Sequence, residues 1–481
     1  MNRKRYAGCN AGGYLTISLA ITLTLVISLA LTLIEGVRRN TMMLEIECAV
    51  DTGMNNILAE YHRELWQQYG LFFIDTSYGT GKPDYHQTLE HLKEYISINL
   101  GEQEKLLEIV GSDFTDLHVK DGEVLELSVA SDEGGAVMRR QIAECMEEKI
   151  GITYLQEILE WINVIEAHDM MGTWYADMKQ EAESGLANWE EILKNQKEST
   201  GSMNFLETAE WMKQLQAGVL QLMLGLEDIS NAEIIGGEYL SHRTLLEGTG
   251  IAAGKEFEDG LWEQLLLCEF VLDKTGRYGV PKNGSKLQYQ TEYILCGVET
   301  DVGNLSEVVD KLLVFRETAN AVHILACQEK MDIVKTLSDS LASALGAPEV
   351  SLVFQILFVV LWAGFEGLWD VEQLLEGNAV PLLKSDTQWH YGLPNISGQE
   401  SQGFQGTEQE LRYEDYLRIF LMLQDKQVTT YRLMDIMEMD IRMTDGNREF
   451  RMDGCADCVK VKIDVESGYG YDFSVTRRYG Y

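Results

Sequence analysis

YLTISLAITLTLVISLALTLI, which runs from Tyr14 to Ile34, is a stretch of 21 residues without a charged side chain. As an α-helix it would be about 31 Å long, which matches the hydrocarbon core of a bilayer. A cleaved signal peptide has a shorter apolar run that ends in a small-residue cleavage site, and no convincing site of that kind ends this run. The stretch therefore predicts a retained transmembrane helix.

The charges around this helix predict its orientation. Residues 1–13 form a short basic tail. Arg38 and Arg39 follow the helix, so the difference in basic residues is small, but acidic residues come next at Glu45, Glu47 and Asp51. Basic residues favour the cytoplasmic side of a membrane. We therefore expect a single-pass protein of the cell membrane, with its N-terminus in the cytoplasm and the bulk of the chain outside it.

Small residues recur at every fourth position of the predicted membrane helix. Ridges of this kind allow two membrane helices to approach closely. The alternative is that the hydroxyls bond only to carbonyls of their own helix. A straight partner could face about three consecutive members, because four residues advance about 400°. The predicted packing residues are Thr16, Ala20, Thr24, Ser28, Thr32 and Gly36.

The helical pattern continues beyond the membrane. Ile46, Val50, Gly53 and Ile57 keep three- and four-residue spacings, and the pattern ends near Gly70, so one helix of about 55 residues is expected. Gly36 and Gly53 are candidate bends. The segments that follow predict a strand at 71–75, a helix at 83–100 and a hairpin within 117–129, turning at Asp121-Gly122. Helices are expected over most of 135–225 and at 261–272, 304–345, 349–376 and 413–443, with a strand at 287–298 and β-structure at 449–481.

These segments define a predominantly helical α+β fold. The apolar run 350–364 is 15 residues long and contains Gln355, so it predicts a buried core helix and not a second span. The expected organisation comprises a tail (1–13), the anchor (14–34), a helix extension with a small α/β region (35–134), a mainly helical body (135–394), a loop (395–410), and a helix with a C-terminal β segment (411–481).

The composition excludes one class of partner. The chain has 77 acidic and 39 basic residues and a net charge of −38. The first 39 residues are net positive, so the acidity lies in the remainder. Such a surface repels phosphate backbones and anionic lipid headgroups. We therefore expect no nucleic-acid partner for the body.

Searches for catalytic motifs find none. Gly254-Lys255 resembles the end of a phosphate-binding loop, but Thr249 stands where the loop requires glycine. The chain has no GxSxG elbow and no HExxH motif. His86 and His91 are five residues apart, which places them off a common helix face. The sequence thus predicts no catalytic residue, cofactor or metal site, and no enzyme.

Cys455 and Cys458 form a CxxC sequence. A structural zinc site would need a second pair, and none exists. A redox CxxC usually opens a helix, whereas an alternating segment follows this one. Two readings stay open, a local disulfide or two separate thiols.

The opening from Gly13 to Arg38 resembles the anchors of TadE/TadG-like pseudopilins of tight-adherence (Flp-type) pili. More closely, most of the chain resembles an uncharacterised Gram-positive family whose genes lie near such pilus genes. The stretches that carry this resemblance are 47–51, 59–65, 71–79, 292–297, 315–320 and 413–418.

The resemblance implies a long anchor helix capped by an α+β head, used for assembly or surface display. Its partners would be the bilayer and other pseudopilin or pilus-assembly membrane proteins. Gly13 and Tyr14 are the candidate processing site. Typical pilins carry glutamate at the fifth position after the cut, where this chain has Ser18, so the resemblance does not extend to that feature. The alternative function is a surface-anchored hydrolase or ligand-binding module with a cleft in the helical body.

Overall fold

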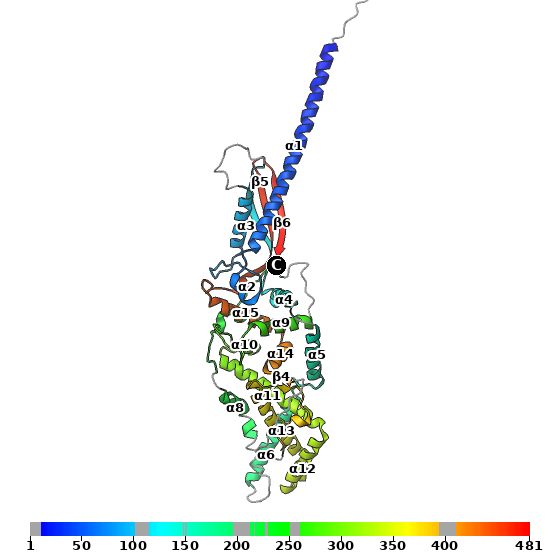
Figure 1. The fold of residues 1–481 in the computed structure, drawn as a ribbon, viewed down its shortest axis with the longest axis vertical. Helices are drawn as coiled ribbons and strands as arrows, with labels where there is room; N and C mark the ends of the chain where they lie inside the picture. Colours follow the sequence, from blue (N-terminus) through cyan, green and yellow to red (C-terminus); the bar gives the residue numbers. More distant parts are fainter. Residues whose placement is uncertain are drawn as a thin grey trace, which may run out of the picture.

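The computed structural model describes residues 11–101, 115–147, 149, 152–195, 212–215, 217–226, 229–250, 260–393 and 410–481. Helices predominate and a small antiparallel sheet joins them, so the expected fold class is confirmed. The molecule is elongated, with α1 projecting from one end, the sheet beside its lower half, and helices forming the rest (Figure 1). The loop expected at 395–410 lies almost wholly outside the described residues.

The helix α1 (Ala11–Leu58) runs without interruption for 48 residues. Its apolar half, through Ile34, is exposed and is long and apolar enough to cross a membrane. Its second half is buried on one face, where Ile46 and Val50 are fully covered. The helix continues through Gly53, where a Cβ atom would lie 3.0 Å from Ile96, so this glycine permits close packing.

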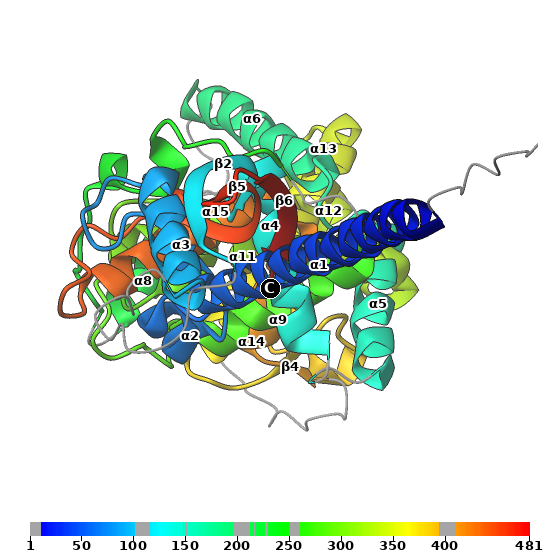
Figure 2. The same cartoon turned by 90° about the horizontal axis from the view of Figure 1, so that it is seen from above.

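Apolar side chains of α1 pack against α3 (Tyr85–Asn99) and one face of the sheet. Figures 1 and 2 both show α1 running beside α3 and β6. The sheet consists of β1 (Ile74–Asp75), β2 (Leu117–Val129), β5 (Cys455–Ser467) and β6 (Asp472–Gly480). β5 is central: β2 pairs with one edge, and β1 and β6 pair with the other, all antiparallel. The C-terminal β segment therefore completes a sheet begun by residues 74–129.

The hairpin predicted at Asp121-Gly122 is wrong. β2 passes straight through both residues, which pair with Asp464 and Ile463 of β5. The ladder shifts register just before Asp121, as at a β-bulge, and the Asp121 carboxylate accepts a hydrogen bond from the Gly122 N–H. Pairing with β5, which lies more than 300 residues further along the chain, thus keeps Asp121-Gly122 extended, although this dipeptide is typical of turns.

The remaining elements form the helical body, apart from the short α2 (Arg63–Tyr69). They are α4 (Asp132–Glu147), α5 (Ile152–Ala167), α6 (Trp174–Asn195), α8 (Gly218–Gly225), α9 (Leu261–Lys274), α10 (Gln290–Cys296), α11 (Asp301–Ala326), α12 (Gln328–Ala344), α13 (Ser351–Leu375), α14 (Tyr413–Leu423) and α15 (Lys426–Arg442). A two-stranded ladder pairs β3 (Val380–Pro381) with β4 (Glu410–Leu411). Short 3-10 turns η2 (Gly236–Glu238), η3 (Leu240–His242) and η7 (Met452–Gly454) complete the segments used below.

The apolar run 350–364 lies in α13, which packs against α6, α11 and α12. By length and composition this helix could also span a membrane, but 61% of its most apolar window is buried inside the protein. Phe358, Val360 and Leu361 are fully buried. The prediction of a core helix is confirmed.

Several boundaries differ from the sequence predictions. The helix expected to continue to Gly70 ends at Leu58, and a separate helix, α2, covers Arg63–Tyr69. The strand expected at 71–75 is limited to Ile74–Asp75. The segment 287–298 was expected to be a strand and instead forms α10, which ends at the left-handed residue Gly297. The expected helix 304–345 divides at Cys327, whose extended backbone separates α11 from α12. The expected helix 413–443 divides before Asp425, whose carboxylate caps α15 by accepting from Gln427 and Val428 N–H groups.

Two readings were open for Cys455 and Cys458, and the structure does not show the disulfide. Neither sulfur is disulfide-bonded, and both residues lie in β5. Residues three positions apart in a strand are separated by about 10 Å, whereas bridged cysteines have Cα atoms no more than about 7 Å apart. The other reading, two separate thiols, agrees with the structure.

Candidate functional site

Two groups of charged side chains converge inside the helical body. The first, which we call the buried ion cluster, consists of Arg316, Glu366, Asp370 and Lys384, all fully buried. Arg316 Nη2 lies 2.9 Å from Asp370 Oδ2, and Lys384 pairs with both Glu366 and Asp370. Two cations face two carboxylates, so the cluster is balanced in charge.

The buried ion cluster joins separate elements of the body. Arg316 on α11 donates to the carbonyls of Pro381 and Leu382, and Glu366 on α13 accepts from the backbone N–H groups of His390 and Tyr391. Burial raises the pKa of Glu366, while the Lys384 ammonium acts in the opposite direction. Each of the four charged side chains is paired with another member of the cluster, and this indicates a role in stability.

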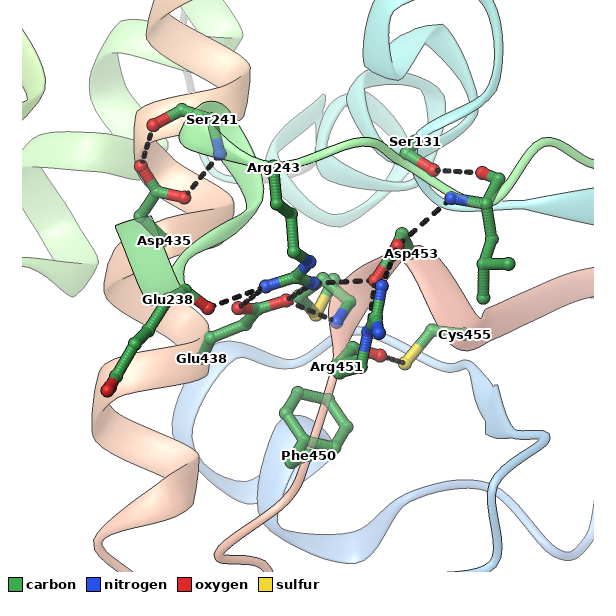
Figure 3. A network of polar contacts seen from close by, with 12 residues as sticks. Ser131, Glu238, Ser241, Arg243, Asp435, Glu438, Phe450, Arg451, Asp453 and Cys455 are labelled. Atoms are coloured by element: carbon green, nitrogen blue, oxygen red, sulfur yellow. Dashed lines mark hydrogen bonds and ion pairs between the residues drawn. The ribbon is translucent and has the colours of Figure 1, made fainter. Parts of the chain in front are cut away.

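The second group lies where α15, η3 and η7 meet (Figure 3). Arg243 lies between two fully buried carboxylates: its Nη2 is 2.5 Å from Glu438 Oε1 and 2.6 Å from Asp453 Oδ1. Arg442 also reaches Glu438, at 2.9 Å, and Arg451 reaches Asp453, at 2.8 Å. Two buried acids thus hold three guanidinium groups.

The state of these acids follows from their partners. Burial alone would raise the pKa of Asp453, but the arginines outweigh it and lower the pKa. Asp435, one turn before Glu438 on α15, accepts hydrogen bonds from Ser241 N–H and from Tyr293 Oη–H. Burial raises the pKa of Asp435 to about 6, and the nearby Glu438 carboxylate acts in the same direction, although the hydrogen bonds from Ser241 and Tyr293 oppose the shift.

The arginines border an open cleft of about 680 Å³. We call it the arginine cleft; its cationic residues are Arg243, Lys286, Arg442, Arg448 and Arg451. The buried ring of Tyr239 also lines it, with the Lys286 ammonium 5.5 Å and the Arg442 guanidinium 5.3 Å from the ring centroid. Met439, Met443, Gly81 and two exposed acids, Glu238 and Glu449, complete the wall. A cleft of this size can hold a small organic molecule.

The family of this chain is established over the same region. The sequence matches a family of unknown function, DUF5702, across residues 195–467, which is more than half of the chain. The chain belongs to this family. No curated protein and no solved structure matches it. The DUF5702 match includes the buried ion cluster and every cationic residue of the arginine cleft, and it begins well after α1.

The residues predicted for membrane packing lie outside the DUF5702 match, on the bare half of α1. The side chains of Thr16, Thr24 and Thr32 donate to the carbonyls of Gly13, Ala20 and Ser28, respectively. Gly36 has no other heavy atom within 4 Å of the position a Cβ would take. The three threonine hydroxyls therefore bond to carbonyls of their own helix in the single chain, and packing of this ridge against another helix stays a prediction.

The candidate processing residues, Gly13 and Tyr14, lie in the first turn of α1. Tyr14 is 84% exposed, and Gly13 O accepts the hydrogen bond from Thr16. The chain is therefore helical on both sides of the candidate cut. Processing at this point stays a prediction.

A third group resembles a metal site. His323 Nε2 and Cys327 Sγ lie 2.9 Å and 3.7 Å from Asp386 Oδ1, close enough together to share an ion. The Lys330 ammonium pairs with the same oxygen. Lys330 and His323 lower the pKa of Asp386 to about 2. Because a lysine already supplies the cation at this carboxylate, we assign the group a structural role.

Sequence reasoning missed the arginine cleft because its residues are far apart in the chain. Arg243 is separated from Glu438 by 195 residues and from Asp453 by 210. One signal was present. The ten residues 442–451 contain three arginines, Arg442, Arg448 and Arg451, whereas the whole chain has about two acids for each base. A local reversal of charge in such a chain indicates a site for an anion.

Proposed function

We propose that this chain is a single-pass membrane protein that works as a structural or assembly component of the cell surface. Its N-terminus is cytoplasmic and its head is outside the cytoplasm. The protein acts by contact and is of the pseudopilin-like kind that accompanies tight-adherence pili. One observation carries the proposal: a single uninterrupted helix, α1, is both the apolar segment and part of the core of the head.

A shared helix fixes the orientation of the head. At 1.5 Å per residue, the 48 residues of α1 form a rod of about 72 Å. Met42, Ile46 and Val50 are buried against α3 and the sheet, so the rod cannot rotate without unpacking the core. An enzyme would need only a tether, whereas assembly with other membrane proteins needs a fixed geometry.

The head touches α1 again directly beyond the apolar segment. Tyr471 Oη–H donates to Glu35 Oε1 at 2.7 Å, and the Arg38 guanidinium lies 4.2 Å from the ring centroid of Tyr469. Tyrosine and arginine are favoured at the boundary between bilayer and water. The tip of the β5–β6 turn would therefore lie against the membrane surface.

The pilus association rests on the sequence resemblance to TadE/TadG-like anchors, and the orientation rests on the flanking charges. The acidic head supports a surface location, because a high net charge favours solubility and reduces association. The partners under this proposal are the bilayer and other pilus-assembly membrane proteins.

A second candidate function is a surface ligand-binding module, which the arginine cleft favours. The alternative of a hydrolase has less support. Glu438 and Asp453, the buried carboxylates behind the cleft, are engaged by arginines, and this lowers the pKa of Asp453. A general acid needs the opposite shift.

Topology is tested with protease on intact cells stripped of wall. The head should be degraded while a cytoplasmic marker survives. Survival of fragments beyond Arg39 together with loss of a known surface protein would place the head in the cytoplasm and end the proposal.

Contact function is tested by deletion and by two matched insertions. Deletion should abolish surface pili, and the parent gene should restore them. Seven alanine-rich helical residues inserted between Arg39 and Asn40 keep the rod and change its facing by only about 20°. Seven Gly/Ser residues at the same point make it a flexible tether. We expect the helical insertion to rescue pili better than the flexible one. Intact pili in the deletion strain, or equal rescue by both, would contradict the proposal.

A further inference from the structure

We propose that the arginine cleft binds a small phosphate ester. The first argument is local charge. The chain has about two acidic residues for each basic one, yet the lining of this cleft has five cationic residues and two acidic ones, Glu238 and Glu449, both exposed. Even when the buried Glu438 and Asp453 are counted, cations outnumber acids. An acidic protein retains such a reversal where it attracts an anion.

The second argument is that the arginines are held in place before any ligand arrives. Arg243 is fixed by Glu438 and Asp453, Arg442 by Glu438, and Arg451 by Asp453, as Figure 3 shows for Arg243 and Arg451. A guanidinium fixed by a carboxylate behind it loses little freedom when it binds an oxyanion. Its planar fork matches the oxygens of phosphate.

The third argument concerns two cations that the buried acids do not engage. Lys286 donates to the Tyr239 hydroxyl at 2.9 Å, and Arg448 is exposed. Within the part of the chain that the structure describes, neither forms an ion pair with a carboxylate. Both line the same cleft and can turn toward a bound oxyanion.

The remaining lining indicates an organic ester and not a bare ion. Met439, Met443 and the ring of Tyr239 offer apolar surface beside the cations. The cleft volume of about 680 Å³ greatly exceeds that of a single phosphate, and it falls within the range of small-molecule sites. A phosphate joined to a polyol or sugar would use both kinds of surface.

The position of the cleft disfavours a lipid of the surrounding bilayer. From Ile34, where the apolar segment ends, to Leu58 the helix rises about 36 Å. The cleft is lined by Gly81, and α15, which also lines it, lies below the far end of α1 (Figure 1). A headgroup in the anchoring membrane would be tens of ångströms away, so the ligand comes from solution.

The test uses the full-length protein in detergent with four probes: sn-glycerol 3-phosphate, inorganic phosphate, glycerol, and nanodiscs containing phosphatidylglycerol. Calorimetry should show saturable binding of glycerol 3-phosphate that weakens as salt is added. Inorganic phosphate should bind more weakly, and glycerol should not bind. Tighter binding of inorganic phosphate than of the ester, or recognition only of the nanodiscs, would overturn the proposal.

Variants locate the site. Arg448→Gln and Lys286→Gln remove cations without exposing a buried acid, so both should fold with an unchanged melting temperature. Each should weaken binding of glycerol 3-phosphate about tenfold, the size expected for one charge-assisted contact. Lys335→Gln, an exposed lysine on α12 away from the cleft, is the matched control and should bind like the parent. Equal loss in Lys335→Gln, or no loss in the two cleft variants, would show that the cleft is not the site.

Discussion

Arg477 in the last strand donates a hydrogen bond from Nε to Asp51 Oδ1 in the first helix, at 2.7 Å, across 426 residues of sequence. Both side chains are partly exposed, at 29% and 40%, so the pair itself contributes little to stability. It lies beside an apolar contact between β6 and α1, to which β6 contributes Phe473 and Val475. The first helix and the last strand therefore form one unit.

The first prediction tests the docking of α1 into that unit. Ile46→Ala should lower the free energy of unfolding by about 2–5 kcal/mol, because Ile46 is fully buried and its truncation leaves a cavity. Leu44→Ala, two residues earlier on the same helix, is the control; Leu44 is 62% exposed, so its effect should stay below about 0.5 kcal/mol. Urea titration of the full-length protein in mild detergent measures both. Equal effects would mean that this face of α1 does not pack in the head.

A second prediction concerns the buried ion cluster. Asp370→Asn should destabilise the protein by about 3–5 kcal/mol, because it leaves Arg316 and Lys384 with only Glu366 to balance them in a fully buried site. Glu372→Gln, on the exposed side of the same helix, is the matched control and should change the melting temperature very little. A small effect of Asp370→Asn would show that water reaches the cluster.

The parts of the fold that sequence reasoning could predict were those specified locally. The apolar half of α1 and the helix α13 follow from runs of apolar residues, and the C-terminal strand β5 follows from its alternation. The prediction of a strand at 287–298 was wrong, because Gln290 to Leu295 of this helix are buried on every side and show no helical stripe. The Asp121-Gly122 turn failed because the partner of β2 is β5, far along the chain.

The candidate site could not be predicted for a related reason. Its charged residues come from η3, α15 and η7, and only folding brings Arg243 next to Glu438 and Asp453. A charge count along the sequence can detect the arginines near 442–451. It cannot show that two buried acids hold them at the edge of a cleft.

The third prediction is a pH dependence caused by Glu292. This fully buried carboxyl has its pKa raised from 4.5 to about 7 by burial, although Tyr278 N–H and Tyr413 Oη–H donate to Oε1 and oppose the shift. Between these pH values the folded protein keeps a proton that the unfolded chain releases. Its contribution to stability is therefore full below about pH 4.5 and is lost as pH rises through 7.

Glu292→Gln removes this ionisation. Relative to the parent, the variant should gain on the order of 3 kcal/mol in unfolding free energy between pH 4.5 and 8, from a pKa shift of this size. Glu307→Gln, an exposed position on α11, should follow the parent at every pH. Denaturant titrations across this range measure the difference. Parallel curves for the parent and Glu292→Gln would show that Glu292 ionises normally in the folded protein.

The last prediction concerns the small-residue ridge on the apolar half of α1, which we propose to cross the membrane. The Thr24 hydroxyl already donates to Ala20 O, so a neighbouring helix would meet the ridge by shape and not through that hydroxyl. Thr24→Leu with Ser28→Leu should therefore abolish contact with a partner helix. Thr24→Val with Ser28→Ala keeps the residues small and should preserve it. Crosslinking through a cysteine placed at Ala20 in membranes reads out the contact. If the small pair loses the crosslink as fully as the leucine pair, hydrogen bonding holds the helices together. If the parent shows no crosslink, the ridge has no partner and its hydroxyls serve only their own helix.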